Sequence, residues 1–84
     1  MYVFYHKQFE KKFRLLPLKI KNKFYERLEL FIENQFAEVL NNHSVEKFFP
    51  DCRSINISGD YRAILKENND VIIFITIGTH AELY

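Results

Sequence analysis

The spacing of apolar residues changes halfway along the chain, and this change limits the folds that the sequence can adopt. In the first half they recur every three or four positions, the spacing of one helix face; they are Ile20, Phe24, Leu28, Phe31, Ile32 and Phe36. In the second half the spacing becomes two, and it ends in the almost continuous apolar run Val71–Ile77. Because period two is typical of strands and an unbroken run of a strand buried on both faces, the sequence predicts helices followed by a sheet.

The N-terminal half predicts one strand, two helices and a loop. Tyr2–Tyr5 is short and rich in β-prone residues, so we expect a strand there. A first helix is indicated by the spacing of Phe9, Phe13 and Leu16. Pro17 ends that helix or opens the next, and the apolar stripe predicts a long helix from Leu18 to Phe36. Residues 37–51 are expected to form an irregular loop.

The C-terminal half predicts three strands joined by tight turns. Turn residues occur at Ser58–Asp60 and Asn68–Asp70. The strands are Ser54–Ser58, Tyr61–Lys66 and Val71–Ile77, the last ended by Gly78. Tight turns make these strands antiparallel. We therefore expect one α+β domain over residues 1–84, in which the N-terminal strand and two helices pack on one face of an antiparallel β-sheet. The other face is partly polar and remains open for a ligand.

The charge is unevenly distributed along the chain. The net charge is only +1, yet residues 7–23 hold seven basic side chains and one acid, Glu10. On the predicted helices these basic residues point outward, and among them are Lys11, Lys12, Lys19 and Lys23. A one-sided basic surface is typical of contact with a phosphate backbone. A solvated helix face that only keeps the protein in solution explains the charge equally well.

Cellular location is constrained by three features. The single cysteine, Cys52, cannot form an internal disulfide, which favours a reducing compartment. No apolar run is long enough to cross a membrane, and the N-terminus lacks a signal-peptide pattern. We therefore expect a cytoplasmic protein with no membrane contact. Cys52 is expected to be a small apolar residue, with a nucleophilic role as the alternative.

Histidine is the side chain best suited to proton transfer near neutral pH, and the chain has three: His6, His43 and His80. The predicted meander can bring His80 to one edge of the sheet with Asp60 and Arg62. The alternative is that each is an ordinary surface residue or local cap. His43, Asp60 and His80 are also a chemically reasonable metal ligand set, but no pair has the close spacing of a metal motif. We therefore expect neither a metal nor another cofactor.

Two segments resemble a known family. The stretch Arg53-Ser-Ile-Asn-Ile-Ser-Gly-Asp-Tyr-Arg62 is similar to the central hairpin of RelE/ParE-superfamily toxins. The ending Gly78-Thr-His-Ala-Glu-Leu-Tyr84 resembles the C-terminal motif of the YafQ-like branch. The order of elements agrees along essentially the whole chain. The resemblance implies a RelE-like fold and a toxin of a type II toxin–antitoxin system.

The resemblance also implies a chemistry, cleavage of mRNA on the ribosome without a metal. The RNA 2′-hydroxyl attacks the adjacent phosphorus, which requires a base, an acid and groups that stabilise the charged phosphorane. Carried over from the family, the catalytic residues are His80, His43, Asp60 and Arg62, and the substrate-binding residues are Tyr84, Asn56 and Tyr61. Two positions depart from the YafQ-like pattern, since Asn56 replaces a histidine and Tyr61 a tryptophan. Asn56 cannot transfer a proton, so we expect a working but slower enzyme.

The implied partners are a cognate antitoxin, with which the toxin forms a hetero-oligomer, and the ribosomal 30S A site with its mRNA. The basic helix residues would contact ribosomal RNA phosphates. Two alternatives remain open. One is a ParE-like toxin that inhibits DNA gyrase without cutting RNA, and the other is a degenerate toxin that only binds its antitoxin. The histidine in the C-terminal motif argues against the first alternative, while Asn56 keeps the second open.

Overall fold

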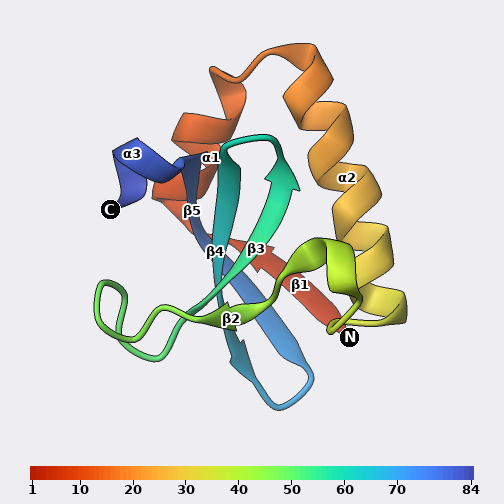
Figure 1. Cartoon of the computed structure of the whole chain (residues 1–84). Coiled ribbons are helices and arrows are strands. Elements are labelled where there is room, and N and C mark those ends of the chain that lie inside the picture. Colours follow the sequence, from red (N-terminus) through yellow and green to blue (C-terminus); the bar gives the residue numbers. More distant parts are fainter.

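A five-stranded sheet forms the centre of the computed structural model, which describes all of residues 1–84 (Figure 1). Its strands are arranged in the order β1-β5-β4-β3-β2. Along the chain the elements are β1 (Tyr2–Tyr5), α1 (Lys7–Arg14), α2 (Leu18–Glu33), the 3₁₀ helix η1 (Glu38–Leu40), β2 (His43–Ser44), β3 (Arg53–Ser58), β4 (Tyr61–Asn68), β5 (Val71–Thr79) and α3 (His80–Leu83). The predicted α+β fold class is confirmed.

The sheet is mixed rather than wholly antiparallel. The expected meander is present, because β3 pairs antiparallel with β4 and β4 with β5. The N-terminal strand joins this sheet at the edge of β5 and runs parallel to it, with Tyr2 opposite Val71 and Tyr5 opposite Phe74. Only a tight turn forces an antiparallel pairing, and β1 and β5 are separated by most of the chain.

Helix α2 ends earlier than the apolar spacing predicts. At Asn34 the backbone leaves the helix with φ −154°, and the Asn34 side chain accepts a hydrogen bond from the Phe36 N–H at 3.2 Å. Asparagine competes in this way for backbone groups, which favours helix ends. Phe36 consequently lies outside the helix and is 64% exposed, so its expected place on the buried stripe is wrong. No helix of the structure has the length and apolar character that a membrane span needs.

The main core lies between the two long helices and one face of the sheet. Phe24 of α2 is fully buried at its centre, with ring centroids 5.2 Å from Phe9, 5.2 Å from Phe13 and 5.1 Å from Phe74. Tyr5 stacks on Phe9 and Phe74 at the margin of this group. The aromatic residues supply the large buried area that a domain of 84 residues needs.

A smaller core covers part of the opposite face. Val45, Cys52 and Ile64 are buried there, and side chains of the β2–β3 loop and of α3 pack against them. In Figure 1 this loop (green) and α3 (blue) lie on the same side of the sheet. The expected irregular segment 37–51 thus contains a 3₁₀ helix and a short edge strand, and the face that was expected to be open is partly closed.

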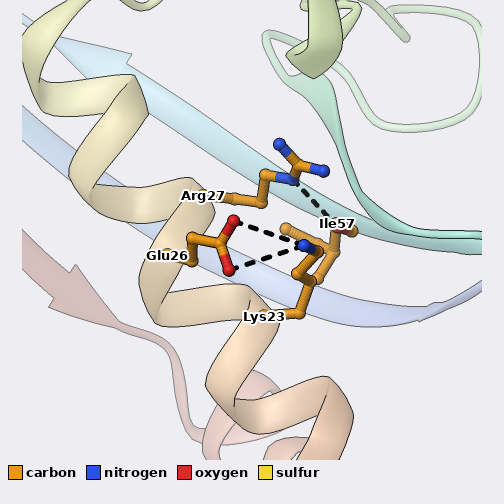
Figure 2. Close-up of polar contacts among 4 residues, drawn as sticks. All are labelled: Lys23, Glu26, Arg27 and Ile57. Atoms are coloured by element: carbon orange, nitrogen blue, oxygen red, sulfur yellow. Dashed lines mark hydrogen bonds and ion pairs between the residues drawn. The ribbon is translucent and has the colours of Figure 1, made fainter.

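A β-bulge in β3 is held from the helix side. The register shifts between Asn56 and Ser58, which leaves Ile57 as the extra residue. Its carbonyl accepts a hydrogen bond from Arg27 Nε at 3.1 Å, as Figure 2 shows. One turn earlier on α2, Lys23 forms an ion pair with Glu26 at 3.2 Å. Arg27 therefore ties α2 to the β3–β4 hairpin near its turn.

The last strand extends past its predicted end and leads directly into a short helix. Gly78 was expected to end β5, but it pairs with Arg62, and Thr79 pairs with Tyr61. Thr79 then caps α3 in a reciprocal arrangement with Glu82. The Thr-x-x-Glu pattern of this capping box is visible in the sequence, although the helix was not predicted.

Candidate active site

A pocket of about 450 Å³ opens on the face of the sheet that α1 and α2 do not cover. It lies where the β2–β3 loop meets β4 and α3. Its lining residues are His43, Ser44, Val45, Glu46, Lys47, Phe48, Arg62, His80 and Tyr84. Three of the four predicted catalytic residues, His43, Arg62 and His80, are therefore brought together from separate elements, and the predicted substrate residue Tyr84 lies with them.

His80 is the first residue of α3 and is exposed. Its backbone N–H donates to the Asp60 carbonyl at 2.9 Å, which fixes the start of α3 against the β3–β4 turn. Its imidazole lies beside the Tyr84 ring with centroids 4.8 Å apart. The position of the His80 ring therefore depends on the short helix that follows β5.

That helix is held by the contact between Thr79 and Glu82. The Thr79 N–H donates to Glu82 Oε1 at 2.7 Å, and the Glu82 N–H donates to the Thr79 hydroxyl at 3.3 Å. The hydrogen bond from the Thr79 N–H, followed by the Thr79 hydroxyl and, as a smaller influence, Lys12, lowers the pKa of the Glu82 carboxyl. A lowered pKa means that the cap stabilises the fold at neutral pH and loses this effect as pH falls through the pKa of Glu82.

His43 stands on the edge strand β2 and is exposed. Its Nδ1 lies 2.7 Å from the carbonyl oxygen of Asn41. Because a carbonyl only accepts, we assign the hydrogen to Nδ1, which leaves Nε2 of the neutral ring with a free lone pair. His43 is thereby arranged to accept a proton through Nε2.

Arg62 lies on β4, and its guanidinium bends toward the hairpin turn. Its Nη1 donates to the Gly59 carbonyl at 2.7 Å and to the Tyr61 carbonyl at 3.0 Å. These bonds use one nitrogen only, and Nε and Nη2 form no hydrogen bond within the protein, so their donors remain available to an anion. Arg62 is therefore a cation fixed by backbone contacts on one side.

The remaining predicted residues of the hairpin do not line the pocket. Asp60 is exposed in the turn and contributes its backbone carbonyl to the His80 contact. Asn56 pairs with Arg62 across the strands, and its side-chain Oδ1 is buried without a hydrogen-bond partner. Tyr61 packs against the main core on the helix side. Their predicted roles stay predictions.

Tyr84 is packed rather than free. Its ring contacts Phe48 with centroids 5.1 Å apart and Phe49 at 6.3 Å, and its hydroxyl is buried. The exposed aromatic ring of the pocket is Phe48. Sequence reasoning missed Phe48 and Lys47, because they lie in a segment that shows no periodic pattern.

The four predicted phosphate-contact lysines differ in their surroundings. Lys11 and Lys19 are exposed on the helices, on the layer behind the pocket. Lys23 is engaged with Glu26. Lys12 reaches the edge of the sheet, where its Nζ and Glu82 Oε1 each lie 3.1 Å from the place a Gly78 Cβ would occupy. Lys12 therefore contributes to the surroundings of α3.

Cys52 belongs to the small core and is 6% exposed. Burial raises the pKa of its thiol, an effect that Lys66 partly opposes.

Since the thiolate is the reactive form, we expect iodoacetamide at pH 7.5 to label native Cys52 many-fold more slowly than the urea-unfolded chain. Equal labelling rates in the two states would contradict this and reopen the nucleophile interpretation. No three His, Cys, Asp or Glu side chains gather as a metal-binding group.

An α+β domain with helices packed on one face of a five-stranded mixed sheet is the fold of RelE-like toxins. The chain belongs to the family described as the ParE toxin of the type II toxin–antitoxin system parDE, whose model matches residues 3–84. A comparison with curated protein sequences gave no match.

Solved structures agree with this assignment. YafQ from E. coli is 26% identical, with 98% of this chain and 96% of that chain covered and a TM-score of 0.82. The toxin in the E. coli DinJ–YafQ complex is also 26% identical, with 98% and 94% covered and a TM-score of 0.80. The RelB–RelE complex from Methanococcus jannaschii is 20% identical, with 96% and 94% covered and a TM-score of 0.70, and shows the shared fold. The expected resemblance to the YafQ-like branch is confirmed.

Proposed function

We propose that this toxin is a metal-independent endoribonuclease that cuts mRNA in the 30S A site of the ribosome. One observation carries the proposal: two imidazoles and a guanidinium from three different elements, His43, His80 and Arg62, line one pocket. Attack by a 2′-hydroxyl on a phosphodiester requires a base, an acid and a group that stabilises negative charge. Two imidazoles can transfer the protons, and a guanidinium can stabilise the charge. No metal or other cofactor is needed for these steps.

In the proposed reaction His43 Nε2 removes the proton of the 2′-hydroxyl, because the Asn41 carbonyl holds the hydrogen on Nδ1. The 2′-oxygen bonds to the phosphorus and the bond to the 5′-oxygen breaks. His80, as the imidazolium, donates its proton to that leaving oxygen, which yields a 2′,3′-cyclic phosphate and a 5′-hydroxyl. The free donors of Arg62 stabilise the charged phosphorane between these steps.

The other residues carried over from the family have supporting roles in the proposal. Tyr84 packs against the His80 ring and lines the pocket. Asn56 lies next to Arg62 and can donate its amide to a phosphate oxygen. Asp60 and Tyr61 are proposed on the resemblance alone, since their side chains lie outside the pocket.

The basic helices give a second contact for the ribosome. Lys11, Lys12, Lys19 and Lys23 lie on the helix layer or at its edge, whereas the pocket opens on the other face of the sheet. We propose that the helices contact ribosomal RNA phosphates while the pocket receives the mRNA. Because ribosomes are cytoplasmic, the proposed activity takes place in the cytoplasm.

We also propose that a cognate antitoxin binds this toxin in a hetero-oligomer. Solved relatives are found as DinJ–YafQ and RelB–RelE complexes. The edge strand β1 and the exposed Tyr2 and Phe4 offer unpaired backbone and apolar area to such a partner. Co-expression with the product of the neighbouring gene should yield a complex on a tagged toxin. A tagged, folded toxin that never retains this product would contradict the proposal.

The activity is tested by primer extension on a defined mRNA in a cell-free translation reaction. We expect discrete cuts at codon positions with purified toxin, absent when ribosomes are left out. The cuts should be unchanged when the toxin alone is stripped with EDTA and dialysed before it is added to the translation reaction. Cleavage of free RNA as efficient as the cleavage of ribosome-bound mRNA would contradict ribosome dependence.

A second candidate is inhibition of DNA gyrase, favoured by the match to the ParE toxin family. Intact mRNA from a protein that still stops growth would support this candidate, and a gyrase supercoiling assay would then follow. Intact mRNA without any toxicity would indicate a degenerate toxin that only binds its antitoxin.

A further inference from the structure

Phe48 is an exposed aromatic ring at the pocket and is not part of either core. It is 54% exposed, whereas the adjacent Phe49 packs against the small core. Its ring meets Tyr84 at an interplanar angle of 64° with centroids 5.1 Å apart, so an edge-to-face contact holds it. Folding therefore gains little burial from a phenylalanine at this position.

The loop fixes Phe48 in this exposed position. The N–H groups of Phe48 and Phe49 both donate to the Val45 carbonyl, at 2.9 and 2.8 Å. Across the loop, Glu46 Oε2 accepts from the Asp51 N–H at 2.7 Å. These contacts hold the loop in one conformation. Little conformational entropy is therefore lost when a ligand binds to the Phe48 ring.

The groups around the ring are those that attract a nucleotide. Lys47 Nζ lies 5.9 Å from the centre of the Phe48 ring. His43, His80 and Arg62 line the same pocket. Glu46 is the one side-chain carboxylate among the lining residues, and it is engaged by the Asp51 N–H. An aromatic face beside cationic side chains, here Lys47 and Arg62, is the combination that binds single-stranded nucleic acid, since bases stack on the ring and phosphates meet the cations.

We infer that Phe48 is a stacking platform for one base of single-stranded RNA, with Lys47 at the neighbouring phosphate. This inference rests on the proposed function for the identity of the physiological RNA, but the stacking itself does not require cleavage. It gives a base-stacking role to Phe48, whereas Tyr84, whose hydroxyl is buried, packs edge-to-face against the Phe48 ring. Removing one base–aromatic contact should weaken RNA binding by about 5- to 150-fold.

The chain contains no tryptophan, so a single introduced one reports on its own surroundings. We would compare Phe48→Trp with Phe36→Trp while titrating a short single-stranded 2′-O-methyl RNA, which resists cleavage. Phe36 is a matched control, because it is 64% exposed and has the Arg53 guanidinium 5.7 Å from its ring centre, yet it lies outside the pocket. We expect saturable fluorescence quenching for Phe48→Trp and none for Phe36→Trp.

A second measurement guards against a perturbing tryptophan. Phe48→Ala should bind a fluorescein-labelled copy of the same RNA about 5- to 150-fold more weakly than wild type by anisotropy, and Phe36→Ala should bind as wild type does. Equal affinity of Phe48→Ala and wild type, or equal quenching at both tryptophans, overturns the inference. Stacking at Phe48 by a protein that leaves ribosomal mRNA intact would uphold the inference while the proposed nuclease fails. Cleavage of ribosomal mRNA by a protein that shows no stacking at Phe48 would overturn the inference and support the proposed nuclease.

Discussion

The His80→Ala variant is expected to cut ribosome-bound mRNA about 10²- to 10⁴-fold more slowly than the wild type, because it lacks the acid for the leaving oxygen. His80 is exposed, and its side chain forms no hydrogen bond within the protein, so the substitution should leave the fold intact. The backbone contact from His80 N–H to Asp60 is retained by alanine. The measurement is the single-turnover cleavage rate on a programmed ribosome, with the circular dichroism of each variant as a check of folding.

His6→Ala is the matched control for this prediction. His6 caps α1, where its Nδ1 accepts from the Gln8 N–H at 3.1 Å, and it lies outside the pocket. Its loss should cost about 0.5–2 kcal/mol of stability, the usual effect of losing a helix cap, without a change in cleavage rate. Loss of a proton-transfer group should slow cleavage by about 10²-fold or more. A cleavage rate of His80→Ala within about threefold of the His6→Ala rate would therefore contradict a proton-transfer role for His80.

The Phe24→Ala variant should lose about 3–5 kcal/mol of unfolding free energy, the range for removing a buried phenylalanine. Phe24 is fully buried and contacts five other aromatic rings, including Phe9 and Phe74. At about 0.05–0.15 kcal/mol per residue, a chain of 84 residues has a total of about 4–13 kcal/mol. The change therefore removes a large share of the stability, and urea unfolding followed by circular dichroism measures it.

Phe36→Ala provides the comparison, because it deletes the same atoms from a ring that is 64% exposed. The Arg53 guanidinium lies 5.7 Å from the centre of its ring, and exposed contacts of this kind are worth about 0.5–1 kcal/mol. Phe24→Leu, which retains more of the buried volume, should lose less unfolding free energy than Phe24→Ala. A Phe24→Ala urea midpoint close to that of Phe36→Ala would show that the aromatic core is not the main source of stability.

The fold was predictable where local pattern and burial agree. The long apolar stripe led to α2 and the alternating segments led to β3, β4 and β5. Two features depended on information that spacing does not contain. The parallel pairing of Tyr2–Tyr5 with β5 is a long-range contact, and the early end of α2 depends on the side chain of Asn34. Helix α3 has only four residues, too few for periodicity, and depends on its capping box.

The site was predictable in part, and mainly through the resemblance. Spacing alone offered no reason to join His43 to His80, which are 37 positions apart in the sequence. They line one pocket because β2 pairs with β3 at the edge of the sheet and α3 follows β5. The register of β4 on β5 explains why Arg62 lies near His80. Lys47 and Phe48 escaped prediction because a braced loop, rather than a repeating element, places them at the pocket.

The central claim is that the pocket of His43, Arg62 and His80 cuts mRNA through attack by the 2′-hydroxyl. The most direct test uses ribosomes programmed with two mRNAs that differ only by a 2′-deoxy nucleotide at a mapped cut position. We expect cleavage of the all-ribose mRNA with a 2′,3′-cyclic phosphate end, and no cleavage at the deoxy position. Equal cleavage of both mRNAs, or an intact all-ribose mRNA in the presence of toxin that still stops growth, would contradict it.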